Sequence, residues 1–127
     1  KHTLTVFPRE TDRQYGVICF FDCLHDLGDP EAAARHAAKV LAPGGTVMLV
    51  EPFAHDRTED NLNIVGQLYY AGSTTMCCAH AISEGGRLVL GAQAGEARLA
   101  EVFRRAGFTH FRRAAETPFN LILEARR

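Results

Sequence analysis

Three side chains that can exchange protons stand near the ends of two apolar runs. His25 and Asp26 follow the run VICFFD at residues 17–22, and Glu51 ends the run TVMLVE at residues 46–51. A histidine, with an unperturbed pKa of roughly 6.5, is the usual general base at neutral pH. A carboxylate bonded to one ring nitrogen fixes the tautomer and stabilises the imidazolium that forms on proton uptake. The pattern is typical of a base, His25, aimed at a substrate hydroxyl and oriented by Glu51 or Asp26.

A strand–helix–strand unit has to position these residues. Both runs have the length and continuous apolar character of strands buried on both faces. Between them, Asp29 suits a helix N-cap and Pro30 the first helical position, while the PGG at residues 43–45 stops the helix. The apolar positions at helical spacing are Ala33, Ala34, Ala37, Val40 and Leu41. The unit predicts two parallel strands joined by a right-handed crossover.

The topology of such a unit decides whether the histidine and the glutamate meet. In open parallel sheets, ligands bind beyond the carboxyl ends of the strands, and neighbouring strands lie about 4.8 Å apart. If the two strands are neighbours, we expect His25 and Glu51 to meet at one rim of the sheet. The alternative is a loop histidine that packs at the sheet edge, with Asp26 capping the turn.

The rest of the chain predicts two more helices and an antiparallel strand pair. One helix is expected over roughly residues 60–80, followed by a glycine-punctuated loop up to Gly95. The segment EARLAEVFRRAGF predicts a helix that ends at Gly107 and faces the core through Leu99, Val102, Phe103 and Ala106. Strands are expected in THFRRAAET and FNLILEA, and a short one is possible at residues 2–7.

Composition narrows the possible partners and the compartment. The chain has 127 residues, enough for one domain, and its 14 basic and 15 acidic residues nearly balance, which argues against nucleic acid or an anionic membrane as partner. No apolar run reaches the roughly 20 residues of a membrane span, and no secretory leader is visible. The cysteines, at positions 19, 23, 77 and 78, form no C-x-x-C pair. This usage indicates reduced thiols in a cytoplasmic protein and no metal site.

The segment YGVICFFDCLHDLGDPEAAARHAAKVLAPGGTVMLVEP, residues 15–52, resembles class I S-adenosylmethionine-dependent methyltransferases. In that family a strand ending in V-L-H-x-L precedes a helix and then L-x-P-G-G-x-L-L-I-x-E. The H-D-L-x-D here is similar to the H-D-W-x-D of small-molecule O-methyltransferases, bacterial ones included, with Leu27 in place of the tryptophan of plant-type enzymes. The resemblance implies that His25 is the general base and that Glu51 helps to hold it. It extends to AGEARLAEVFRRAGFTHFRRAAETPFNLILEARR and so covers residues 13–127.

The resemblance also implies a fold and a division of the chain. We expect an α/β fold, a partial Rossmann-like methyltransferase sheet that holds the fourth to seventh strands, with the last pair antiparallel and helices flanking it. The family's glycine-rich cofactor loop, G-x-G-x-G, is absent; Gly44–Gly45 enters a strand instead of leaving one. Residues 1–127 are therefore expected to be the C-terminal part of a methyltransferase catalytic domain. Its parent would use S-adenosylmethionine and no metal, and this chain alone would be inactive.

Two further groups of site residues follow from the same resemblance. Phe21 and Asp22, just after the fourth strand, are expected to touch the cofactor. The residues expected to line the substrate site are Asn61, Tyr69, Tyr70, Met76 and His80. Packing in the core is the alternative role for Phe21 and for the helix expected over roughly residues 60–80.

Two classes of function remain open. The first is the catalytic half of an O-methyltransferase that acts on a small-molecule hydroxyl. The second is a non-catalytic remnant that assembles through the exposed edge of the strand at residues 17–21, as a homo-oligomer. A nicotinamide-dependent reductase ranks last, because it needs the same absent glycine loop and a Tyr-x-x-x-Lys pair that the sequence lacks.

Overall fold

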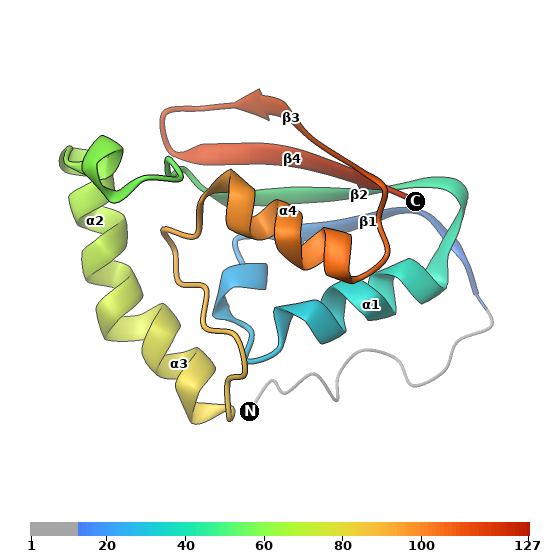
Figure 1. Cartoon of the computed structure of the whole chain (residues 1–127), viewed down its shortest axis with the longest axis horizontal. Helices are drawn as coiled ribbons and strands as arrows, with labels where there is room; N and C mark the ends of the chain where they lie inside the picture. Colours follow the sequence, from blue (N-terminus) through green and yellow to red (C-terminus); the bar gives the residue numbers. More distant parts are fainter. Residues whose placement is uncertain (1–12) are drawn as a thin grey trace.

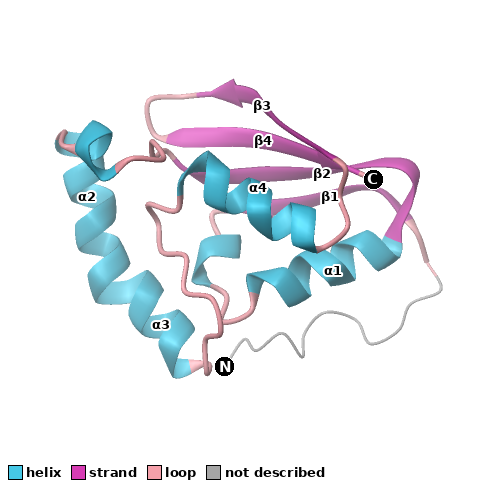
Figure 2. Ribbon diagram, viewed as in Figure 1, coloured by secondary structure: helices cyan, strands magenta, loops and turns pink. Residues whose placement is uncertain are grey.

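The computed structural model describes residues 13–127, so the possible strand at residues 2–7 lies outside the described residues. The chain forms a mixed α/β fold with one sheet and flanking helices (Figures 1 and 2), as expected. The elements, in chain order, are β1 (Tyr15–Phe21), α1 (Pro30–Val40), β2 (Leu41–Pro52), α2 (Ile64–Gly72), α3 (Cys78–Ser83), α4 (Gly95–Arg105), β3 (His110–Glu116) and β4 (Asn120–Arg126).

The four strands lie in the order β1-β2-β4-β3. β1 and β2 are parallel, whereas β4 runs antiparallel to both β2 and β3. The expected antiparallel last pair is confirmed, and the final strand inserts between β2 and β3 (Figure 2). Because β4 runs against β2, its first residue, Asn120, pairs with Pro52 at the end of β2. We call this side of the sheet, where β1 and β2 end and β4 begins, the carboxyl rim.

One face of the sheet holds the core. Helices α1 and α4 lie against this face (Figure 1), and alternate residues of β2 and β4 point into it. The core combines strand residues with small and large apolar residues of the helices: Phe20, Val47, Leu49, Leu121 and Leu123 with Ala33, Ala34, Ala37, Leu99, Val102 and Phe103. This layer fixes the strands, and with them the carboxyl rim, on a rigid base.

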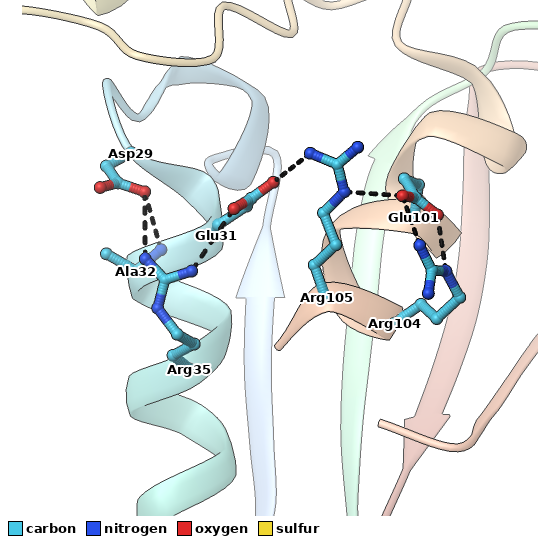
Figure 3. Close-up of polar contacts among 7 residues, drawn as sticks. All are labelled: Asp29, Glu31, Ala32, Arg35, Glu101, Arg104 and Arg105. Atoms are coloured by element: carbon cyan, nitrogen blue, oxygen red, sulfur yellow. Dashed lines mark hydrogen bonds and ion pairs between the residues drawn. The ribbon is translucent and has the colours of Figure 1, made fainter. Parts of the chain in front are cut away.

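The start of α1 has the predicted cap. Asp29 Oδ1 accepts a hydrogen bond from Ala32 N at 2.8 Å, as expected of an N-cap. Glu31, in the first turn, accepts from Arg105 of α4 at 3.2 Å, and Arg105 also binds Glu101 (Figure 3). Exposed ion pairs of this kind add little stability. They link the first turn of α1 to the last turn of α4 at the surface.

The end of α1 differs from the prediction. The helix ends at Val40 and not at the PGG of residues 43–45, because Leu41 is already extended (φ −77°, ψ 126°) and pairs with Tyr15. The PGG forms the irregular first part of β2, in which Gly44 adopts the left-handed conformation (φ 73°) that glycine tolerates best. β2 therefore begins five positions earlier than residue 46, the predicted start of the strand.

The middle helix also differs in detail. The predicted single helix over residues 60–80 is α2 and α3 joined by a π-helical segment, Ser73–Cys77. The buried residues of this region are small, namely Gly66, Ser73 and Ala81, while Leu68 and Met76 are exposed. The large apolar residues Leu68 and Met76 therefore lie on an outward face of this segment. No helix in the described part of the chain has the length and apolarity of a membrane span.

Strand β1 is an edge strand with one exposed face. It pairs only with β2 among the described strands. Val17 and Phe21, on the face away from α1 and α4, are 61% and 60% exposed. Within residues 13–127 no helix covers that face (Figure 2). Both the edge and this face are thus available to another chain segment.

Candidate active site

The turn that follows β1 carries the predicted base over the end of β2. Asp22 N donates to Val50 O at 2.7 Å, which closes the parallel pair, and Asp22 then adopts a positive φ of 43°. It is the one non-glycine residue with positive φ in the described part of the chain. Such conformations are costly for residues other than glycine and recur at functional sites. The bend leads into the 3-10 turn Leu24–Asp26, which contains the histidine.

Glu51, the last but one residue of β2, pins this turn. Its Oε1 accepts from Leu24 N at 3.0 Å, and its Oε2 lies 2.5 Å from His25 Nδ1. Glu51 and His25 are 1% and 4% exposed. Because a carboxylate only accepts, His25 Nδ1 carries the proton of this bond. The structure therefore brings together the two residues that the topology predicted to meet; their catalytic roles stay predictions.

The second ring nitrogen of His25 points toward Asp26. The Nε2–Oδ1 distance is 3.3 Å, so Asp26 lies on the opposite side of the ring from Glu51. The sequence left open whether Glu51 or Asp26 orients His25. In the structure Glu51 binds Nδ1, and Asp26 lies beside Nε2. Burial alone would lower the pKa of His25, but the hydrogen bond to Glu51 and the charges of Glu51, Asp26 and Asp22 outweigh it and raise that pKa above its usual 6.5.

This arrangement suits proton transfer at one atom. With Nδ1–H held by Glu51, the lone pair of His25 lies on Nε2, and an imidazolium formed there is flanked by two carboxylates. The buried hydrogen bond keeps the ring in one orientation. The site can therefore act as a general base toward a hydroxyl group that reaches Nε2.

The predicted cofactor residues also lie at the carboxyl rim. The ring of Phe21 is largely exposed, and Asp22 is exposed. Asp22 Oδ1 accepts from the side-chain amide of Asn120 at 3.1 Å, across from the start of β4. Asn120 was not among the site residues predicted from the sequence. Its signal was available in principle, because the first residue of a strand antiparallel to β2 must lie where β2 ends.

The predicted substrate-lining residues fall into different environments. Tyr69 OH donates to Phe119 O at 2.6 Å, and burial, followed by the charge of Asp22, raises the pKa of Tyr69. This contact places Tyr69 at the carboxyl rim. Tyr70 is half-buried, Met76 is exposed, and the exposed His80 lies 3.7 Å from Glu84. A lining role for any of them stays a prediction.

Asn61, the fifth predicted lining residue, has a structural role. Its Oδ1 accepts from His55 N at 2.8 Å, and its amide donates to His55 O and Arg57 O at 2.9 and 3.0 Å. The buried side chain thus closes the loop between β2 and α2. Both amide hydrogens are used within the chain, which leaves no donor for a ligand.

Cys77 is the second residue that the sequence analysis did not place at the site. The sequence indicated an apolar filler, but the π-helical segment brings its thiol beside His25 and Asp26. Burial, followed by the neighbouring Asp26 carboxylate, raises the pKa of Cys77 to about 11, so its thiol is protonated at neutral pH. Contacts between segments so far apart in sequence leave no local pattern.

Comparisons with known proteins agree on the fold. The chain matches solved structures of an O-methyltransferase family protein from Burkholderia thailandensis (20% identity, TM-score 0.61), human N-acetylserotonin methyltransferase in complex with SAM (15%, 0.65), and the O-methyltransferase NcsB1 from neocarzinostatin biosynthesis in complex with SAH and 1,4-dihydroxy-2-naphthoic acid (22%, 0.61). The matches cover 91%, 94% and 93% of this chain and 31% of each solved chain, so this chain spans about a third of their length.

A match to a family of sequences identifies the chain. A search of curated proteins found none that matches. The family model described as "Methyltransferase domain", in contrast, matches residues 2–113, which is most of the chain. The sheet order and the antiparallel last pair agree with this assignment. The chain therefore belongs to the methyltransferase-domain family.

Proposed function

We propose that residues 1–127 are the C-terminal part of a methyltransferase catalytic domain that transfers a methyl group from S-adenosylmethionine to a hydroxyl of a small molecule. The observation that carries the proposal is the buried His25–Glu51 hydrogen bond at the carboxyl rim, which leaves Nε2 of the ring as a base. This is the place where open α/β sheets bind their ligands.

The residues of this chain would divide the work as follows. When bound, S-adenosylmethionine supplies an electrophilic methyl group on a sulfonium. His25 Nε2 would accept the proton of the acceptor hydroxyl, whose oxygen could then take the methyl group that the cofactor supplies; the products would be a methyl ether and S-adenosylhomocysteine. Glu51 holds the ring and stabilises the imidazolium. Alignment of acceptor and methyl group supplies much of the remaining rate.

The fit of this chain to the cofactor is partial. At the carboxyl rim, Phe21 offers an exposed ring and Asp22 a carboxylate that Asn120 orients, which suits contact with an apolar chain and a cationic group. No glycine-rich cofactor loop of the G-x-G-x-G type follows a strand in residues 13–127. The rest of the cofactor site has to come from outside this chain, and we therefore propose that the chain alone is inactive.

Solved neighbours support the substrate class. The names of two of them specify an O-methyltransferase in complex with SAH and a dihydroxynaphthoic acid, and a methyltransferase of N-acetylserotonin in complex with SAM. N-acetylserotonin and the dihydroxynaphthoic acid are both small molecules, and the dihydroxynaphthoic acid is an aromatic diol. We infer an aromatic or polyketide-like hydroxyl as acceptor for the protein that contains this chain.

Calorimetry and a transfer assay test this function. We expect that residues 1–127 alone bind neither S-adenosylmethionine nor S-adenosylhomocysteine, whereas the complete protein binds both. With aromatic hydroxyl acceptors, the complete protein should form methyl ethers, which mass spectrometry of the product identifies. Methylation at nitrogen or carbon, or no transfer from a cofactor that is bound, would contradict the proposal.

A non-catalytic remnant is the second candidate, and the open edge of β1 favours it. Val17 and Phe21 expose apolar side chains beside an edge that pairs with no described strand on its outer side. Such edges template association. We propose that two copies of the chain pair through β1 as a homo-oligomer.

Light scattering during gel filtration checks this association. We expect a dimer that dissociates on dilution, and we expect Val17→Lys to shift the chain to monomer because a charge on an edge strand disfavours pairing. Lys39→Arg on α1, on the other side of the sheet, serves as the control and should leave the mass unchanged. A wild-type monomer at every concentration would refute the association.

We also propose a reducing, cytoplasmic location. All four cysteines are free, and their thiols are spread over β1, its turn and the π-helical region. Secreted domains of this size usually pair such residues.

A further inference from the structure

Three potential metal ligands converge on the Nε2 side of the histidine. One ring nitrogen of His25, one carboxylate oxygen of Asp26 and Cys77 Sγ all lie within 4.8 Å of one another, and His25 Nε2 is 3.3 Å from Asp26 Oδ1. The first two come from the turn after β1 and the third from the π-helical segment between α2 and α3. The sequence analysis expected no metal site, because no local spacing links the thiol to the other two residues.

Two of these atoms face each other at close range. Glu51 accepts the hydrogen bond from His25 Nδ1–H, so in the neutral ring the lone pair lies at Nε2, and Asp26 Oδ1 lies 3.3 Å from that nitrogen. Asp26 Oδ1 is buried and accepts no hydrogen bond within the described chain. The His25 side chain, which is aimed at it, is 5% exposed. A positive charge between the two atoms, either a proton on Nε2 or a bound cation, would satisfy both of them.

We propose that His25, Asp26 and Cys77 form a site for a thiophilic divalent cation, and Zn²⁺ fits the donor set best. Zinc takes imidazole nitrogen, carboxylate oxygen and thiolate sulfur as ligands in a tetrahedron. Its bond lengths put neighbouring ligand atoms roughly 3.3–3.5 Å apart. The His25–Asp26 distance of 3.3 Å already matches, and Cys77 Sγ lies within 4.8 Å of its two partners, so a small side-chain movement would complete the three-ligand geometry. Binding releases the thiol proton to solvent, and water fills the fourth position.

The surroundings of the histidine match those of a metal ligand. Histidines that bind a metal through one nitrogen usually donate the other N–H to a carboxylate, which fixes the tautomer. Glu51 already provides this contact at 2.5 Å, and its other oxygen is held by Leu24 N at 3.0 Å. The ring is therefore oriented before a cation arrives. The partly exposed carboxyl group of Asp26 lies on the open side of the cluster and provides a route in.

Occupation of this site would switch off the base. A cation on Nε2 takes the lone pair that has to accept the hydroxyl proton, so Zn²⁺ should inhibit methyl transfer. The inhibition rests on the proposed function, whereas the metal site itself does not. The two can fail separately, because binding is measured on the chain and inhibition on the complete protein.

Cobalt titration of the chain tests the site. We expect one Co²⁺ per chain with a thiolate-to-cobalt charge-transfer band, and Zn²⁺ should displace it. Cys77→Ser should abolish the band and weaken binding at least about 100-fold, and Asp26→Asn should weaken it at least about 10-fold. The matched control is Cys78→Ser, since Cys78 Sγ lies 3.3 Å from Ser73 Oγ and outside the cluster. Far-UV circular dichroism verifies that each variant is folded.

Three results would overturn the metal site: no stoichiometric binding, an unchanged band in Cys77→Ser, or the same loss in Cys78→Ser. In the complete protein, Zn²⁺ should inhibit the wild type and spare Cys77→Ser at the same concentration. If the chain binds Zn²⁺ through Cys77 but transfer is not inhibited, the metal site stands and the assignment of His25 as base is wrong.

Discussion

Replacing His25 by glutamine in the complete protein is expected to lower turnover by roughly 10²–10⁴-fold, the usual contribution of a general base. The glutamine amide can still donate to Glu51, so the turn after β1 keeps its anchor, but it cannot accept a proton at neutral pH. The affinity for S-adenosylmethionine should change little, because the ring is buried between Glu51 and Asp26. Initial rates at saturating acceptor and calorimetry with the cofactor measure the two quantities.

The matched control for this variant is His110→Gln. His110 is exposed at the start of β3, and its Nδ1 lies 2.9 Å from Thr109 Oγ1, in another part of the molecule. It should retain the wild-type rate. If His25→Gln also turned over at the wild-type rate, another group would have to remove the proton and the proposed mechanism would be wrong.

The part of the site that the sequence predicts correctly is the part that topology dictates. The parallel pair follows from two apolar runs joined by a capped helix, and the Asp29 cap forms as predicted. Once those strands are neighbours, residues at or just beyond their carboxyl ends lie at the same rim, and His25 and Glu51 meet there. Chain connectivity over a short distance therefore sufficed for this pair.

The rest depended on long-range packing. Cys77 reaches His25 and Asp26 only because the helical segment after β2 folds back against the turn. The apolar residues of that segment could not show which face is buried, since the buried positions are held by Gly66, Ser73 and Ala81 and leave Leu68 and Met76 exposed. Small residues allow a helix to approach its neighbours closely. They contribute little to a hydrophobic periodicity, so the periodicity does not reveal a buried face made of small residues.

Glu51 has two roles in this scheme, and each can be tested. Glu51→Ala is expected to lower the free energy of unfolding of the chain by about 3–5 kcal/mol, because it leaves Leu24 N and the buried His25 ring without their acceptor. Urea unfolding followed by circular dichroism measures the loss. Glu116→Ala, at an exposed glutamate on β3, is the control and should leave the midpoint almost unchanged.

Glu51→Gln separates the anchoring role from the chemical one. The carbonyl oxygen of the glutamine can replace Oε1 and keep the bond from Leu24 N at the same place, so the turn stays folded. The other side of the amide then offers N–H to His25 Nδ1, which has to become an acceptor, and the ring proton moves to Nε2. The NMR signals of the ring nitrogens should show this change of tautomer. Methyl transfer should fall because the ring lone pair then lies on Nδ1, facing the glutamine, and no longer on Nε2, where the substrate hydroxyl has to lose its proton. If the carboxylate only anchored Leu24, the ring would keep its tautomer and its activity.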